Sequence, residues 1–312
     1  MKNIRYLYAV ILFLFFISCR DTDKNGRLLD TPTTGSIKIS ADESLRPLIE
    51  TEVETFNSIY TKAKVEVLYL PEIEAMEELM KDSVRLAIVT RHLVPEERAY
   101  FKEKRITPDE VDIALSGAAI IVNPERKDTL ISMAQLKQIL SGTVSNWNQL
   151  GSRTNAGIEI VFDNPKSGLV RYLKDSIAKV DKLPANCYAV ENNEAVVDYV
   201  SKNPNALGLI GVEWISDDPT TNTFLKKVKV VGVSGDSTHF QPYQAYMALK
   251  HYPLMRTITV INRETRTGLG TGFSSFLASE RGQRIILKTG LVPKTMPVRI
   301  IEVNPKPFEI EK

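Results

Sequence analysis

Short apolar stretches alternate along the chain with segments in which apolar residues recur every three or four positions. Apolar and polar residues alternate within 36–40, which is typical of a β-strand, and 45–56 then has helical spacing. This pattern predicts strands at 36–40, 64–70, 86–90, 118–123, 158–162, 207–211 and 228–233. It predicts helices at 45–56, 72–80, 95–104, 132–140, 168–177, 194–200 and 272–287, the last preceded by 257–262. Ser44, Ser132 and Ser167 are placed to cap the helices that follow them.

Strands that alternate with amphipathic helices indicate an α/β fold with mainly parallel sheets. In such sheets ligands bind at the carboxyl ends of the strands. The folded part runs from about Gly35 to the end of the chain. Because that length exceeds what one compact core usually holds, we expect two domains.

The first 18 residues have the pattern of a secretory signal. Lys2 and Arg5 precede an unbroken apolar run, Tyr6–Ile17, which is shorter than the ~20 residues a membrane-spanning helix needs. Ser18-Cys19 resembles a bacterial lipobox, in which the cysteine is lipidated. We therefore expect a signal peptide at 1–18 and an extracytoplasmic, lipid-anchored protein. The alternative, an uncleaved anchor, is disfavoured by the short run.

The polar segment that follows is expected to be a flexible tether, residues 19–35. Cleavage after Ser18 would leave 38 basic and 38 acidic residues, so there is no basic surplus to suggest nucleic acid. With Cys19 lipidated, Cys187 is alone, which excludes an internal disulfide. The three histidines are scattered without metal spacing, and we expect neither a metal site nor another cofactor.

Two neighbouring segments carry the strongest functional signal. Gln138–Gly151 reads as a helix end, a glycine turn and a buried tryptophan, Trp147. Val161–Gly168 reads as a strand that enters a Ser-Gly loop and a helix N-terminus. Free backbone N–H groups at such a terminus suit an anion or a polar ligand. The simpler alternative is that Ser167 only caps its helix.

Five segments together resemble phosphate ABC transporter substrate-binding proteins. They occur in the order of that family and cover about residues 36 to 295. The segments are Leu86–Arg91 with Pro95-Glu96-Glu97, Ile139–Trp147, Val161–Arg171, Ala206–Gly211 and Tyr252–Arg256. The resemblance implies a two-lobed, periplasmic-binding-protein-like (type II) α/β fold with two hinge crossings. Lobe one would be 36–116 plus 257–312, and lobe two 117–256.

The resemblance also implies a ligand site in the cleft between the lobes. The ligand would be phosphate or a similar oxyanion, and the partner an ABC permease or another envelope protein complex. Hinge closure rather than catalysis would be the mechanism. The residues carried over are Ser44, Leu45 with its N–H, Thr90, Arg91, Asp163, Ser167, Gly168 and Leu169.

Three residues depart from the family's pattern. The phosphate-clamping arginine aligns at or beside Asp163, the threonine after Ser-Gly is Leu169, and Glu72 occupies a junction that is usually rich in Gly and Ser. With Asp42 and Glu43, these carboxylates are expected at the cleft mouth, where they repel a dianion unless the ligand has a proton to donate. A second hypothesis is therefore an envelope interaction or sensor module that no longer binds phosphate.

An enzymatic reading has little support. Ser176-Ile-Ala-Lys179, Ser201-Lys-Asn203 and Lys288-Thr-Gly290 match short motifs of penicillin-binding enzymes. The nucleophile in those enzymes begins a helix, whereas Ser176 falls at the end of the helix expected after Ser167. No Ser-His-Asp grouping or glycine-rich nucleotide loop is found, and we expect no catalytic activity.

Overall fold

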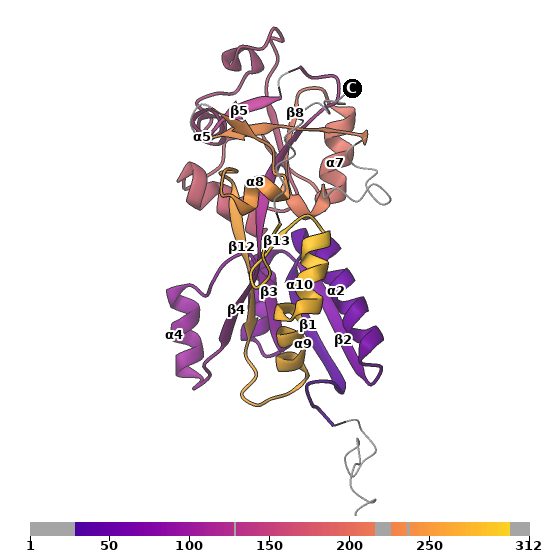
Figure 1. The fold of residues 1–312 in the computed structure, drawn as a ribbon. Helices are drawn as coiled ribbons and strands as arrows, with labels where there is room; N and C mark the ends of the chain where they lie inside the picture. Colours follow the sequence, from indigo (N-terminus) through magenta and orange to yellow (C-terminus); the bar gives the residue numbers. More distant parts are fainter. Residues whose placement is uncertain (1–28, 128, 216–225, 236–237, 300–312) are drawn as a thin grey trace, which may run out of the picture.

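The computed structural model describes residues 29–127, 129–215, 226–235 and 238–299, which form two α/β lobes (Figure 1). A sheet of strand order β2-β1-β3-β12-β4-β8-β6-β7 runs through both lobes. Its strands, with those of a small side sheet, are β1 (Gly35–Asp42), β2 (Ala63–Leu70), β3 (Leu86–Val89), β4 (Asp109–Val122), β5 (Leu130–Ser132), β6 (Glu159–Phe162), β7 (Cys187–Ala189), β8 (Ala206–Gly211), β9 (Lys229–Val230), β10 (Gly232–Ser234), β11 (His239–Phe240), β12 (Met255–Asn262) and β13 (Val292–Pro293).

Helices cover both parts of the sheet. The α-helices are α2 (Arg46–Ile59), α3 (Glu72–Met80), α4 (Pro95–Glu103), α5 (Met133–Leu140), α6 (Gly168–Arg171), α7 (Asn193–Lys202), α8 (Gln244–Ala248), α9 (Leu269–Ala278) and α10 (Glu280–Lys288). Shorter turns are the 3-10 helices η2 (Glu43–Leu45), η3 (Trp147–Leu150) and η5 (Val212–Trp214), and the π-helix η4 (Tyr172–Ala178). In Figure 1, α2, α4, α9 and α10 lie in one lobe, and α5 and α7 in the other.

Lobe one is the part built on β1, β2, β3, β12 and the first half of β4. β1 pairs in parallel with β2 along its whole length and with β3 on its other side. β12 lies antiparallel between β3 and β4. Lobe two is the part built on the second half of β4 with β8, β6 and β7, in which β6 is parallel to both neighbours. The expected parallel pairing thus holds within each lobe, while the joining strands are antiparallel.

The lobes are joined where β4 changes partner. Up to Gly117 this strand pairs with β12, and from Ala118 onward it pairs with β8. The Ala118 N–H donates to the Leu254 carbonyl at 2.9 Å, so the returning chain lies beside β4 at this point. A Cβ atom on Gly117 would lie 3.0 Å from that same carbonyl oxygen, which is tighter than ordinary packing. The two crossing segments therefore approach each other closely because residue 117 is glycine.

Several helix ends follow from local sequence. Ser132 caps α5, with its hydroxyl accepting from the Gln135 N–H and the Gln135 side chain accepting from the Ser132 N–H. Ser167 caps α6 in the same way by accepting from the Val170 N–H. Both expected caps are confirmed. Trp147 is fully buried with its ring under the Arg126 guanidinium, which confirms its core position.

Other expectations were wrong. The helix expected at 272–287 is two helices, because the backbone of Ser279 is extended between α9 and α10. The strand expected at 118–123 begins at Asp109. Ser44 does not cap a helix with its side chain: it lies inside η2, and the preceding Asp42 makes the cap by accepting from the Ser44 N–H. A carboxylate can reach that N–H because Asp42 ends β1 and points into the turn.

No helix among the described ranges is long and apolar enough to cross a membrane. The expected signal peptide, Cys19 and most of the tether lie outside the described residues.

Glu52 on α2 is a carboxyl whose burial lowers the free energy of unfolding. It is 0 % exposed, and neither carboxylate oxygen has a hydrogen-bond partner within the described part of the chain. Burial raises its pKa to about 9. Because the unfolded chain releases this proton near pH 4.5 and the folded chain does not, the free energy of unfolding falls as pH rises from about 5 to 9.

We predict that Glu52→Gln stabilises the protein by about 1–3 kcal/mol at pH 8 and much less at pH 5. Urea denaturation at the two pH values measures this, with Glu54→Gln on the exposed face of α2 as the matched control. Equal stabilisation by Glu52→Gln at both pH values would show that Glu52 is not buried as a neutral acid.

Candidate functional site

The candidate site lies at the carboxyl ends of β1, β3 and β6, where the two lobes meet. β1 ends at Asp42, β3 is followed by Thr90, and β6 is followed by Asp163 and the helix that Ser167 begins. In α/β sheets this edge is where ligands bind. Chain order and strand pairing together bring these residues to one place.

Asp42 joins the two lobes through backbone N–H groups. Its Oδ1 accepts from the Ser44 N–H at 3.0 Å, in the turn after β1. Its Oδ2 accepts from the Gly168 N–H at 3.1 Å, at the N-terminus of α6 in lobe two. One carboxylate therefore takes the position at which two backbone donors from opposite lobes converge.

Gly168 is the point of closest approach. A Cβ atom on this residue would lie 2.5 Å from Glu72 Oε2, 2.5 Å from Thr90 Oγ1 and closer still to Asp42 Oδ2. Three polar groups of lobe one thus lie against the backbone of lobe two. No residue with a side chain fits here unless the lobes move apart.

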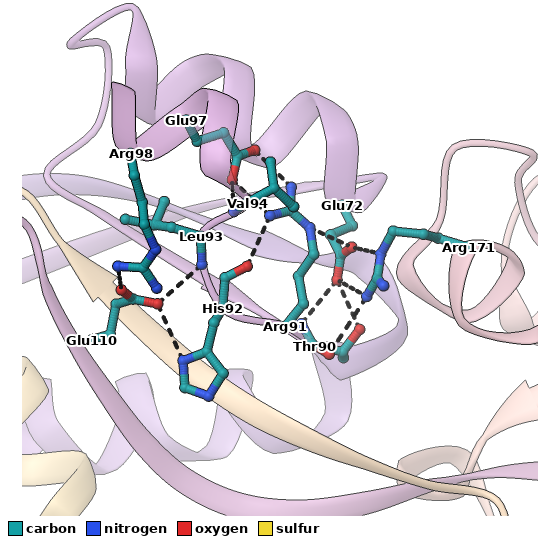
Figure 2. Close-up of polar contacts among 10 residues, drawn as sticks. All are labelled: Glu72, Thr90, Arg91, His92, Leu93, Val94, Glu97, Arg98, Glu110 and Arg171. Carbon is teal, nitrogen blue, oxygen red and sulfur yellow. Dashed lines mark hydrogen bonds and ion pairs between the residues drawn. The ribbon is translucent and has the colours of Figure 1, made fainter. Parts of the chain in front are cut away.

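Glu72, the first residue of α3, is at the centre of the ionic network in Figure 2. Its Oε2 accepts from the Thr90 N–H at 2.9 Å and from the Thr90 hydroxyl at 2.7 Å. Its Oε1 accepts from Arg91 Nε at 3.2 Å and from Arg171 Nε, in lobe two, at 2.5 Å. Burial raises the pKa of Glu72, but the Arg171 charge and hydrogen bond, with those of Thr90 and Arg91, lower it overall. Glu72 is therefore an anion at neutral pH.

Arg91 is held within lobe one. Its Nη1 and Nη2 donate to the two oxygens of Glu97, each at 2.7 Å, while its Nε faces Glu72 (Figure 2). Burial lowers the pKa of Arg91, but the Glu97 hydrogen bonds and the charges of Glu72 and Glu97 raise it overall. The neighbouring His92 contacts Glu110 at 3.1 Å, and Arg98 also pairs with Glu110. These bonds fix the segment after β3, and the Arg91 guanidinium is directed at carboxylates.

Asp163 belongs to a second cross-lobe chain of hydrogen bonds. Its Oδ1 accepts from the Ser167 hydroxyl at 2.8 Å, and its Oδ2 from Asn193 Nδ2 at 3.4 Å. Asn193 Nδ2 also donates to Glu43 Oε2 of lobe one at 2.9 Å. Burial raises the pKa of Asp163 to about 6, although hydrogen bonds from Asn164 and Ser167 oppose it. Asp163 thus shapes the Ser-Gly loop from within lobe two.

The charge on Asp42 is sensitive to pH near neutrality. Burial is the main cause that raises its pKa to about 7, and the negative charges of Glu72 and Asp163 raise it further. The positive charge of Arg256 and the Ser44 hydrogen bond act in the opposite direction. At neutral pH Asp42 is therefore divided between its protonated and charged forms.

Three further contacts cross between the lobes. Trp214 Nε1 donates to the Ser44 carbonyl at 2.9 Å, and the Ile73 N–H donates to the Lys166 carbonyl at 3.3 Å. Lys166 Nζ also pairs with Glu74 at 3.0 Å on the surface. The lobes are therefore in direct contact at several points of the junction.

The predicted site residues fall into three groups. The first group converges at the lobe junction, as described above, and consists of Ser44, Thr90, Asp163, Ser167 and Gly168. Leu45 and Leu169 are 0 % exposed, with side chains in the hydrophobic core, so only their backbone can face a ligand. Arg91 lies against Glu72 and Glu97.

Three of the carboxylates expected at the cleft mouth are instead buried where the lobes meet. Asp42, Glu72 and Asp163 are 0 %, 0 % and 2 % exposed. Sequence reasoning missed the contributions of Arg171, Asn193 and Trp214. Arg171 follows Ser167 by four residues, one helical turn, and this spacing is the signal that would have placed it beside the loop. Within the described ranges, no cluster of His, Cys, Asp or Glu is suited to a metal ion.

Two lobes, a junction lined by strand ends and two crossing segments define a two-lobed binding protein. The family model for the PBP superfamily domain matches residues 29–281, and the chain belongs to that superfamily. The phosphate-binding protein PstS of Bacillus subtilis is 24% identical over 84% of this chain and 82% of its own length. PstS of Borreliella burgdorferi is 23% identical over 94% of this chain and 99% of its own length.

Solved structures are similar over most of the chain. A putative phosphate ABC transporter substrate-binding protein from Clostridium perfringens, solved with bound phosphate, aligns with a TM-score of 0.72 at 25% identity, covering 83% of this chain and all of its own. An ABC-type phosphate transport receptor from Vibrio cholerae aligns with a TM-score of 0.65 at 22% identity, with the same coverage. These likenesses confirm the periplasmic-binding-protein-like fold.

We predict that Arg171→Met lowers the free energy of unfolding by about 1–3 kcal/mol, because it leaves the buried Glu72 with fewer donors. Urea denaturation measures the loss. Lys166→Met is the matched control, since the Lys166–Glu74 pair also joins the lobes but lies in solvent. If the two variants lose the same stability, the Glu72–Arg171 bond does not hold the lobes together.

Proposed function

We propose that this protein is an extracytoplasmic solute-binding protein that closes its lobes on phosphate or a similar oxyanion and delivers it to an ABC permease. The observation that carries the proposal is the Asp42 carboxylate, which accepts from the Ser44 and Gly168 N–H groups of opposite lobes. Donors converging on one acceptor from two helical N-termini suit an anion. The phosphate-binding names of the relatives support the same ligand.

The carboxylates of the junction favour an oxyanion that still carries a proton. Phosphate retains a proton at neutral pH and can donate it to the Asp163 carboxylate, whereas sulfate has none to give. A protonated Asp42 can in turn donate to a phosphate oxygen. An oxyanion without a proton would instead be repelled by Glu72, which stays ionised. Selection of phosphate over sulfate follows from this arrangement.

The proposed movement is a hinge closure about the two crossing segments. In this proposal lobe one is 36–116 plus 257–312 and lobe two is 117–256, so that opening separates Asp42 from Gly168. We further propose that cleavage after Ser18 and lipidation of Cys19 tether the protein to a membrane, with its lobes outside the cytoplasm. The partner is then an ABC permease in that membrane.

We predict that inorganic phosphate raises the unfolding temperature of the purified protein in a saturable manner and that sulfate does not. A ligand at 100 times its dissociation constant stabilises the folded state by about 2.7 kcal/mol, which is readily measured by thermal unfolding. Equal effects of the two anions would indicate a nonspecific salt response. No shift at millimolar phosphate would favour the second hypothesis, an interaction or sensor module.

The pH dependence of phosphate binding tests whether the protonation state of Asp42 controls affinity. If phosphate binds only when Asp42 is protonated, wild-type affinity falls about fivefold from pH 7 to 8 and about tenfold per pH unit above 8. The charged groups that act on Asp42 are Glu72 from α3, Asp163 from the turn after β6 and Arg256 from β12. The lowered pKa of Glu72 keeps this group charged over the same pH range.

We predict that Asp42→Asn removes this dependence. The ratio of wild-type to Asp42→Asn dissociation constants should rise about fivefold between pH 7 and 8, measured by calorimetry. Taking the ratio at each pH cancels the titration of phosphate itself. A constant ratio would mean that the charge on Asp42 does not oppose the ligand.

A further inference from the structure

Arg256 lies at the point where the chain returns from lobe two to lobe one. It is the second residue of β12, and its backbone is paired with Ser116 of β4. Ser116 lies two residues before Ala118, the first residue of β4 that pairs with β8. Its side chain is 0 % exposed. The guanidinium therefore lies inside the junction of the lobes and not on the surface.

This guanidinium has almost no hydrogen bonding of its own. Among the described residues, its Nε, Nη1 and Nη2 have no hydrogen-bond partner. The nearest carboxylate oxygen, Glu213 Oε2, is 3.8 Å from Nη2 and has no hydrogen-bond partner there either. Glu213 Oε1 instead accepts from the Ser116 hydroxyl. An arginine with five donors is rarely buried in this way without an acceptor.

The Arg256 guanidinium lies close enough to the candidate site for its charge to act there. The charge of Arg256 acts on the carboxyls of both Asp42 and Asp163, lowering the pKa of each. The Ser44 hydroxyl, two residues after Asp42, is also buried without a hydrogen-bond partner in the described ranges. Ser44 is held at this corner because its carbonyl accepts from Trp214, the residue after Glu213.

Gly211 leaves room for this arrangement at the end of β8. A Cβ atom there would lie 3.3 Å from Arg256 Nη2 and would collide with Glu213 Oε2. The Gly211 N–H donates to Asn193 Oδ1 at 3.4 Å, and Asn193 is also bonded to Asp163. Gly211 therefore lets Arg256 and Glu213 lie next to the group that holds the Ser-Gly loop.

The other arginines of the junction are already engaged. Arg91 is paired with Glu97 and Glu72, and Arg171 with Glu72. Asp163 stands where the family resemblance places a phosphate-clamping arginine. A dianion bound between the lobes needs a positive charge from elsewhere. Arg256 is a buried guanidinium that makes no hydrogen bond among the described residues and has only the 3.8 Å contact with Glu213.

We propose that Arg256, together with the Ser44 hydroxyl, binds the oxyanion where the two lobes meet, beside the hinge crossing. The proposal rests on the proposed function and names the residue that supplies its charge. A guanidinium fork can donate two parallel bonds to a phosphate, as it does to a carboxylate. Because Arg256 is part of a crossing segment, an anion bound there contacts the hinge itself.

The test is calorimetric titration of inorganic phosphate into the full chain and matched variants. Arg256→Lys keeps the charge beside Glu213 but loses the fork, and we expect phosphate affinity to fall at least tenfold. The double variant Arg256→Met with Glu213→Gln removes both buried charges, and we expect a loss of at least a hundredfold. Arg263→Lys is the matched control and should change affinity less than fivefold, because Arg263 is also buried but follows the far end of β12 and donates to the Leu79 carbonyl.

Ser44→Ala keeps the test decisive if an Arg256 variant fails to fold. This change removes a hydroxyl that makes no hydrogen bond among the described residues, so the unfolding temperature without phosphate should not change. Affinity for phosphate should still fall at least fivefold. Unchanged affinity in Ser44→Ala and Arg256→Lys would overturn the proposal and leave Arg256 as a structural partner of Glu213. A wild-type protein that binds no phosphate would overturn the proposed function as well.

Discussion

The structure depends on two buried carboxylates placed where its lobes meet. Asp42 accepts from backbone donors of both lobes, and Glu72 accepts from Thr90 and from arginines of both lobes. A buried carboxylate is stable only when donors satisfy it, so each of these groups fixes the turns around it. The geometry of the candidate site and the closeness of Gly168 to lobe one follow from this constraint. The lobes close on acidic side chains rather than on a basic pocket.

This constraint also connects the site to the hinge. Opening the lobes must break the bonds from Asp42 to Gly168 and from Glu72 to Arg171, which leaves each carboxylate with fewer donors and more exposed to water. The pKa of Asp42, raised to about 7 mainly by burial, would return toward its ordinary value on opening. Lobe opening is therefore linked to release of a proton, and closure to its uptake. In a binding protein, this proton uptake stabilises the closed state in addition to the free energy of ligand binding.

The sequence predicted the parts of this structure that depend on neighbouring residues. The strand–helix units and the caps at Ser132 and Ser167 are set by local periodicity and short side-chain reach. The predictions failed where the structure depends on contacts between residues that are far apart in the sequence. The extension of β4 back to Asp109 depends on its pairing with β12, nearly 150 residues away. Asp42 rather than Ser44 caps the first turn, and the same carboxylate accepts from Gly168, which lies 126 residues further along the chain. Arg91 matched a motif, yet Glu97 and Glu72 engage it through contacts that no motif encodes.

The most direct test of this account is a crystal structure of the protein grown with saturating phosphate. The account predicts a tetrahedral anion within hydrogen-bond distance of the Ser44 and Gly168 N–H groups, with the Asp42 carboxylate moved from its bridging position or donating a proton to the anion. The Arg256 guanidinium should contact the same anion. A structure in which Asp42 still bridges Ser44 and Gly168, with no anion between the lobes, would contradict it.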